Sequence, residues 1–161
     1  MSFWEPSMRI AIEFAAAGGY GGSSPRASNS ESEDVPVGAL VLSPEGEIIG
    51  RGRNLCLATG DPTAHAEIVA IRQAAARIDN WRLDGCTLVA TLEPCTMCAG
   101  AVHLARISRV VYGAVDERAG AAGSISDALY DRRLGPAVEV ISGVLADDCA
   151  DLLKDFFKRL R

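Results

Sequence analysis

Hydrophobic positions along the chain follow two different periods, and these predict the order of helices and strands. Apolar residues recur at helical spacing between Trp4 and Ala15, which indicates an amphipathic opening helix that Gly18-Gly19 would end. Apolar, β-branched runs predict strands at residues 35–42, 48–54, 87–91, 110–113 and 138–142. Further helices are predicted from Asp61 to about Ile78, from Pro94 onward, and over residues 147–160.

Strands that alternate with helices favour an α/β fold. We expect a three-layer α/β/α arrangement around a five-stranded mixed sheet, in which the first two strands form an antiparallel hairpin and the later strands run parallel. The 161 residues have the usual length of a single domain, residues 1–161. Residues 20–34 are rich in Gly, Ser and acidic side chains and have almost no apolar positions, so we expect a flexible loop there.

Composition narrows the class of protein. Hydrophobic residues make up 48% of the chain and charged residues 23%, as in ordinary globular proteins. No apolar run approaches the length of a membrane span, and the N-terminus lacks the basic-then-apolar order of a signal peptide, so we expect a cytoplasmic protein without membrane contact. Because the cytoplasm is reducing, the chain's 5 cysteines are expected to be buried thiols or metal ligands rather than partners in disulfide bonds. The net charge of −5 argues against broad nonspecific nucleic-acid binding.

Two short segments, His65-Ala66-Glu67 and Pro94-Cys95-Thr96-Met97-Cys98, carry the candidate chemistry. Cys95 and Cys98 are three positions apart on one predicted helix, so their thiols share a face in the first turn, where free N–H groups favour thiolates. His65 falls in the first turn of the preceding predicted helix. One imidazole and two thiolates suit zinc, and three protein ligands leave a fourth position for water, as in catalytic zinc sites.

Glu67 follows His65 by two positions and does not share its ideal helix face, so we assign Glu67 to proton transfer rather than to metal binding. Zinc lowers the pKa of a bound water toward about 7. The resulting hydroxide suits attack on C6 of adenine or C4 of cytosine, with loss of ammonia. A Cys-x-x-Cys pair by itself also fits a redox dithiol or half of a structural zinc site, but its combination with His-Ala-Glu favours a deaminase.

Four segments resemble the bacterial tRNA adenosine deaminases. The likeness runs from about residue 35 to the C-terminus and more loosely includes the opening helix. The zinc motif fits the whole cytidine deaminase-like superfamily, whereas the segments that begin at Asp61 and at Gly120 narrow the likeness to the tRNA branch. The segments are Val35-Pro36-Val37-Gly38-Ala39, Asp61-Pro62-Thr63-Ala64-His65-Ala66-Glu67, Thr91-Leu92-Glu93-Pro94-Cys95-Thr96-Met97-Cys98-Ala99-Gly100-Ala101 and Gly120-Ala121-Ala122-Gly123-Ser124.

This resemblance implies a zinc-dependent hydrolytic deaminase that converts adenosine to inosine at the wobble position of a tRNA anticodon loop. It implies a homodimer with one Zn²⁺ per subunit, held by His65, Cys95 and Cys98, with Glu67 as the proton shuttle. An anticodon loop suits such chemistry because its bases are already unpaired, whereas a base inside a duplex must be flipped out.

The resemblance also implies substrate contacts. The amide of Ala66 and the side chain of Asn54 would face the target base, Asp116 would lie near the nucleotide sugar, and the C-terminal helix around Phe157 would approach the anticodon loop. The chain departs from the family in its long 20–34 segment. It also has Leu134-Gly135-Pro136 near the position where relatives commonly carry Asn-His.

Two other functions remain open at this point. A deaminase of a free base or nucleotide, of the cytosine or guanine type, would use the same zinc and the same glutamate. The acidic net charge mildly favours that substrate, whereas the Gly-Ala-Ala-Gly loop and the basic C-terminus favour tRNA. A noncatalytic zinc-stabilised binding module is the third hypothesis, and the open coordination position and Glu67 argue against it.

Overall fold

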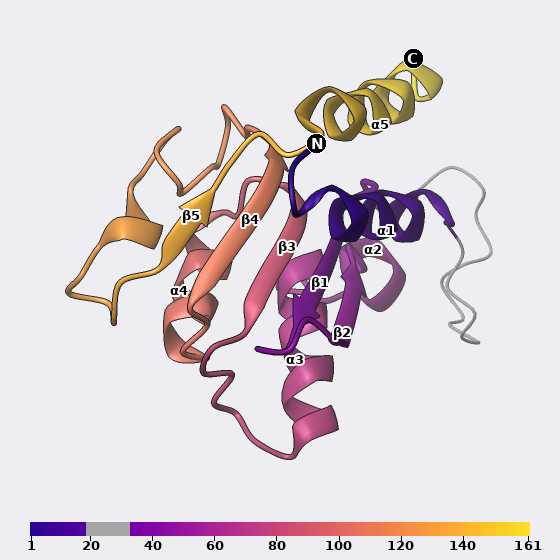
Figure 1. Ribbon diagram of the computed structural model, residues 1–161. Coiled ribbons are helices and arrows are strands. Elements are labelled where there is room, and N and C mark those ends of the chain that lie inside the picture. Colours follow the sequence, from indigo (N-terminus) through magenta and orange to yellow (C-terminus); the bar gives the residue numbers. More distant parts are fainter. Residues whose placement is uncertain (19–32) are drawn as a thin grey trace.

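The computed structural model describes residues 1–18 and 33–161. Within these stretches a five-stranded sheet, ordered β2-β1-β3-β4-β5, stands between two layers of helices (Figure 1). The strands are β1 (Gly38–Leu42), β2 (Ile48–Arg53), β3 (Thr87–Leu92), β4 (Arg109–Ala114) and β5 (Glu139–Ile141). The helices are α1 (Glu5–Ala16), α2 (Cys56–Thr59), α3 (Ala66–Ile78), α4 (Thr96–Leu104) and α5 (Ala146–Arg159), with a 3₁₀ turn, η1 (Ala128–Tyr130).

The sheet is mixed. Strand β1 pairs antiparallel with both β2 and β3, whereas β3, β4 and β5 run parallel. Helices α1 and α5 cover one face and α3 and α4 the other (Figure 1). These arrangements confirm the predicted α/β fold with three layers and a five-stranded mixed sheet.

Alternating residues of the central strands divide the hydrophobic core between the two faces. Val110 and Tyr112 of β4 pack with the residues of α3 and α4, whereas Val111 between them packs with those of α1 and α5. Both faces are buried, which is why these strands read as nearly continuous apolar runs rather than as alternating polar and apolar positions.

Strands β2 and β3 end at the same edge of the sheet, because both run antiparallel to the strand between them. Arg53, the last residue of β2, pairs with Gly38 at the start of β1. The Gly38 amide in turn donates a hydrogen bond to Thr91 Oγ1 near the end of β3, at 3.1 Å. Helices α3 and α4 therefore begin beyond the same sheet edge.

A close approach of α3 to β2 depends on Gly52. A Cβ atom at this position would lie 2.0 Å from the carbonyl oxygen of Ala66, the first residue of α3. Only glycine lets the helix backbone come this near to the strand. Gly52 thus sets how close the start of α3 lies to the sheet.

Several predicted boundaries were wrong, for local reasons. Asp61 does not begin α3. Its Oδ1 instead accepts the Thr63 amide at 2.8 Å in a turn, as Asp-Pro sequences favour, and the helix begins at Ala66. Helix α4 likewise begins at Thr96 rather than at Pro94. Strand β1 starts three residues later than predicted, after Pro36, which has no amide to donate to a ladder.

The short helix α2 was not predicted, and it depends on the end of the segment assigned to a flexible loop. Asp34 accepts hydrogen bonds from the amides of Leu57 and Ala58, at 2.7 and 2.9 Å, and so caps the first turn of α2. The rest of that predicted loop, residues 20–32, lies outside the described residues. None of the helices described is both long and apolar enough to cross a membrane.

Candidate active site

The starts of α3 and α4 bring one imidazole and two thiols together. The Nδ1 atom of His65 lies 3.6 Å from Cys95 Sγ and 3.7 Å from Cys98 Sγ, and the three ligand atoms all lie within 4.8 Å of one another. A tetrahedral zinc with ordinary Zn–S and Zn–N bonds would hold its sulfur and nitrogen ligands about 3.6 Å apart. The spacing of this donor set therefore fits zinc.

His65 and Cys95 were predicted in the first turns of their helices, and each instead lies one residue before its helix. Both have extended backbone angles at the N-cap position, whereas Cys98 is the third residue of α4. An N-cap residue can turn its side chain across the end of its helix. This placement lets two helices that begin at the same sheet edge offer ligands to one point.

The thiols of the cluster are electrostatically unequal. A hydrogen bond from Cys98, with a smaller contribution from His65, lowers the pKa of Cys95 to about 4 against the opposing effect of burial. The same hydrogen bond, together with burial, raises the pKa of Cys98 far above its usual range. Cys95 is thus the thiol of the pair that ionises more readily.

Glu67 lies beside the cluster of His65, Cys95 and Cys98 but does not belong to it. It is the second residue of α3, its side chain is only 4% exposed, and it lines the same pocket as His65 and Cys95. Burial raises the pKa of Glu67 to about 7, and the charge of Cys95 acts in the same direction. The carboxyl group is thus placed at the edge of the metal cluster, open to the pocket.

The pocket encloses about 150 Å³ and contains three of the four predicted substrate-binding residues. Asn54, Ala66 and Asp116 all line it. The position of Asn54 is set by its backbone amide, which donates to the carbonyl oxygen of Val37 at 3.2 Å. The remaining wall is mostly apolar and was not predicted, and its residues are Val35, Val37, Leu92, Glu93 and Ala119.

Phe157, the fourth predicted substrate residue, lies on α5 and does not line this pocket. It is 44% exposed and meets the ring of Phe156 edge-on, with the ring centroids 5.3 Å apart. The end of α5 nevertheless forms an ion pair with the segment that precedes the pocket residue Val35. Arg159 lies 3.7 Å from Glu33, which is two residues before the pocket residue Val35.

Glu93 is a pocket residue to which the sequence reasoning gave no role. It is 1% exposed, and its carboxylate accepts hydrogen bonds from the loop that carries Asp116. Burial by itself would raise the pKa of Glu93, but these hydrogen bonds outweigh it and hold the pKa below its usual value. In the sequence, Glu93 stands alone between an apolar strand and Pro94, without a spacing pattern that would mark its role.

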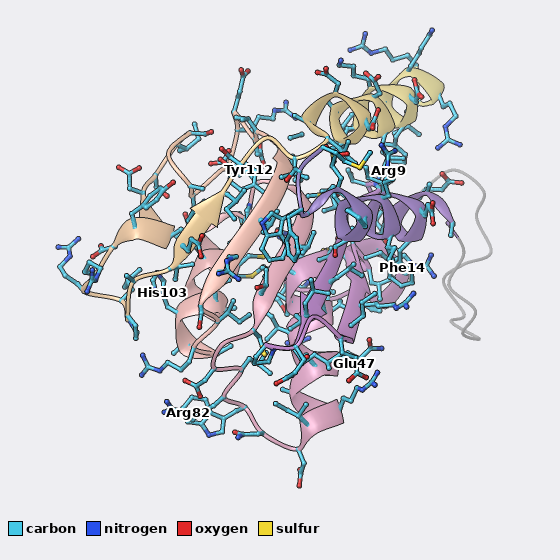
Figure 2. The ribbon with its side chains drawn as sticks, viewed as in Figure 1. Arg9, Phe14, Glu47, Arg82, His103 and Tyr112 are labelled. Atoms are coloured by element: carbon cyan, nitrogen blue, oxygen red, sulfur yellow. The ribbon has the colours of Figure 1, made fainter. Side chains whose placement is uncertain are left out.

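The second histidine and the remaining cysteines stand apart from the metal cluster. His103 is buried on the side of α4 that faces η1, with Nε2 2.9 Å from the carbonyl oxygen of Ala128 (Figure 2). Cys86 and Cys149 are buried thiols, and Cys56 is half-buried. Their positions, away from the cluster of His65, Cys95 and Cys98, fit a packing role.

Comparison with known proteins places the chain in a family. Residues 23–114 match the cytidine and deoxycytidylate deaminase zinc-binding region. The tRNA-specific adenosine deaminase of Haemophilus influenzae is 48% identical over 128 residues, which cover 80% of this chain and 74% of that protein.

Solved structures agree with this placement. A structure from studies of A-to-I editing by tRNA:A34 deaminases superposes with a TM-score of 0.78 at 36% identity, covering 91% of this chain and 97% of that one. A guanine deaminase from Nitrosomonas europaea superposes with a TM-score of 0.73 at 25% identity, over 97% and 85% of the two chains. The chain therefore belongs to the zinc-binding cytidine and deoxycytidylate deaminase family, within its branch of tRNA-specific adenosine deaminases.

Proposed function

We propose that the protein is a zinc-dependent hydrolytic deaminase that converts adenosine to inosine at the wobble position of a tRNA anticodon loop. The observation that carries the proposal is the convergence of His65, Cys95 and Cys98 beside the buried carboxyl group of Glu67, at the end of a pocket of about 150 Å³. Family membership supports the tRNA substrate. Such a substrate implies a cytoplasmic enzyme, and we treat residues 1–161 as one deaminase domain.

His65, Cys95 and Cys98 would hold one zinc ion. When bound, zinc supplies a Lewis acid that makes water nucleophilic at neutral pH. Glu67 accepts a proton from the attacking water, delivers it to the ring nitrogen, and then helps to protonate the departing amine. Water is consumed, and the 6-amino group leaves as ammonia while a carbonyl takes its place.

The remaining pocket residues bind and orient the base. The side-chain amide of Asn54 can both donate and accept hydrogen bonds, which suits reading a base edge, and the amide of Ala66 adds a donor beside it. Asp116 is proposed to approach the sugar. Phe157 is proposed to contact the anticodon loop outside the pocket, which is consistent with the tie between Arg159 and Glu33.

We also propose that the protein acts as a homodimer through the outer face of α4. Apolar or small residues recur along this face at the spacing of one helical stripe, namely Met97, Gly100, Ala101 and Leu104. Leu104 is 75% exposed, and a Cβ at Gly100 would meet nothing within 4 Å. A second copy of the chain would cover this stripe and allow close helix contact at Gly100.

The experiment is deamination of an anticodon stem-loop with adenosine at the wobble position, with free adenosine, cytosine and guanine in parallel. Glu67→Gln keeps the shape of the side chain but removes proton transfer, so its kcat should fall by about a hundredfold to ten-thousandfold. Glu47→Gln, an exposed glutamate paired with Arg77, is the matched control and should retain wild-type activity. Ammonia released only from a free base would overturn the tRNA assignment while leaving the deaminase chemistry in place.

A further inference from the structure

We propose that Glu93 is a positioning residue, whose carboxylate holds the 116–124 loop against the metal-binding turn and so sets the place of Asp116 in the substrate pocket. The substrate part of this inference rests on the proposed function, whereas the loop contacts do not. Glu93 lies between β3 and Cys95, and the loop follows β4, the neighbouring parallel strand.

Among the described residues, all the hydrogen-bond partners of the Glu93 carboxylate lie in this loop, and each oxygen has two. Oε2 accepts the amide of Asp116 at 2.9 Å and the hydroxyl of Ser124 at 2.6 Å. Oε1 accepts the amides of Ala122 and Ser124, at 2.9 and 3.3 Å. A buried carboxylate that is shared among four donors cannot release one of them without leaving an amide or hydroxyl unsatisfied.

Further contacts fasten the loop directly to the metal-binding turn. Gly120 forms an isolated antiparallel bridge with Cys95, and the amide of Ala121 donates to the carbonyl oxygen of Pro94 at 2.8 Å. A Cβ at Gly120 would lie 2.4 Å from the Glu93 carboxylate. The loop therefore passes directly over the carboxylate, with no space for a side chain between them.

Asp116 is the residue through which this arrangement reaches the pocket. Its amide is held by Glu93, and its Oδ1 accepts the amides of Arg118 and Ala119 at 2.9 and 3.2 Å. Asp116 and Ala119 both line the pocket. If the hydrogen bond from the Asp116 amide is lost, this wall can move, while His65 and Cys98 stay fixed by α3 and α4.

Glu93→Gln separates the carboxylate from the shape of the side chain. A glutamine amide has one acceptor oxygen, and its NH₂ group cannot accept the backbone amides that point at it. Either Asp116 or the Ala122 and Ser124 pair must lose an acceptor. Val111→Ala, a core change on the opposite face of the sheet, is the control for destabilisation, and Glu47→Gln is the control for loss of an exposed charge.

The experiment measures three properties of each zinc-loaded variant: amide hydrogen exchange over residues 116–124, zinc content, and KM and kcat on the anticodon stem-loop. We expect Glu93→Gln to exchange faster in this loop, to keep its zinc, and to raise KM by about tenfold, which corresponds to about 1.4 kcal/mol. Ser124→Ala should change the same properties less, and the effects of the two changes should be non-additive because their hydrogen bonds are shared. Val111→Ala should lower the melting temperature without changing KM.

Unchanged loop exchange in Glu93→Gln, or a KM no different from that of Val111→Ala, would overturn the proposal. Exchange is measured without substrate, so it tests the loop contacts whatever the enzyme acts on. If wild-type protein leaves the stem-loop untouched while Glu93→Gln still loosens the loop, the tRNA substrate is wrong and the positioning role of Glu93 stands.

Discussion

The Nδ1 atom of His65 lies 3.6 Å from the Sγ atom of Cys95, although the two residues are 30 positions apart and stand at the N-caps of different helices. This contact joins the two halves of the candidate metal site, which come from α3 and α4. It makes zinc a link between α3 and α4, so changes that move either helix start should be measurable as changes in zinc content.

Removing one ligand should empty the site. Cys98 is fully buried in the cluster, and Cys98→Ala leaves two protein ligands, too few to hold zinc tightly. We expect the dialysed variant to lose most of its zinc and to be inactive. We also expect its melting temperature to stop responding to a chelator, because binding to the folded state is what stabilises it. Cys86→Ala, which changes a buried thiol outside the cluster, should keep its zinc in atomic emission measurements.

The packing of α3 on β2 should be sensitive to a single methyl group. In Gly52→Ala the added Cβ would meet the carbonyl oxygen of Ala66, next to His65, so the helix start must shift. Such overpacking costs about 1–3 kcal/mol of unfolding free energy. We expect lower stability in urea and weaker zinc binding in a competition titration. Gly18→Ala, where the nearest atom would be 3.7 Å from the added Cβ, should change neither, and an equal effect at both positions would contradict this account.

The thiol of Cys149 should make stability depend on alkaline pH. Burial raises its pKa from 9.0 to about 11, so between these values the unfolded chain loses a proton that the folded protein keeps. The free energy of unfolding should therefore fall as pH rises from 9 to 11, by up to about 3 kcal/mol from this group. Urea titrations at several pH values should show that slope in wild-type protein and a smaller one in Cys149→Ala. Parallel curves for the two proteins would refute the assignment.

The proposed dimer surface can be tested on one leucine. Leu104→Glu places a charge in the exposed apolar stripe of α4, where desolvation of an unpaired carboxylate would oppose association. We expect the mass measured by light scattering to fall from that of two chains to that of one. Leu160→Glu changes an exposed leucine at the end of α5 and should leave the dimer intact. A wild-type protein that is monomeric at micromolar concentration would contradict the surface.

The fold and the cluster of His65, Cys95 and Cys98 could be predicted from the sequence because both depend on patterns that are local in the chain. Runs of apolar residues mark each central strand, and the short spacings in His65-Ala66-Glu67 and Cys95-x-x-Cys98 carry their own chemistry. Helix starts were less predictable. Asp61-Pro62 satisfies the usual rule for a helix N-terminus. The Asp61 side chain nevertheless accepts a hydrogen bond within a turn, and the helix begins only at Ala66.

The role of Glu93 could not be predicted because its partners lie more than twenty positions away in the sequence. A single acidic residue at the end of a strand has no spacing pattern to read. The same holds for Asp34, whose capping of α2 joins residues 23 and 24 positions apart. Contacts of this kind depend on the sheet order, which brings the segments before and after different strands to one edge.

Strand β1 sets the distance between the two strands that precede the helices of the metal site. It lies between β2 and β3, the strands that lead toward α3 and α4, so these strands are two inter-strand spacings apart, about 10 Å. Two packed helices need about 8–10 Å between their axes. The antiparallel strand β1 thus separates β2 and β3 by about one helix diameter. The side chains of His65, Cys95 and Cys98 then meet where the starts of α3 and α4 approach each other.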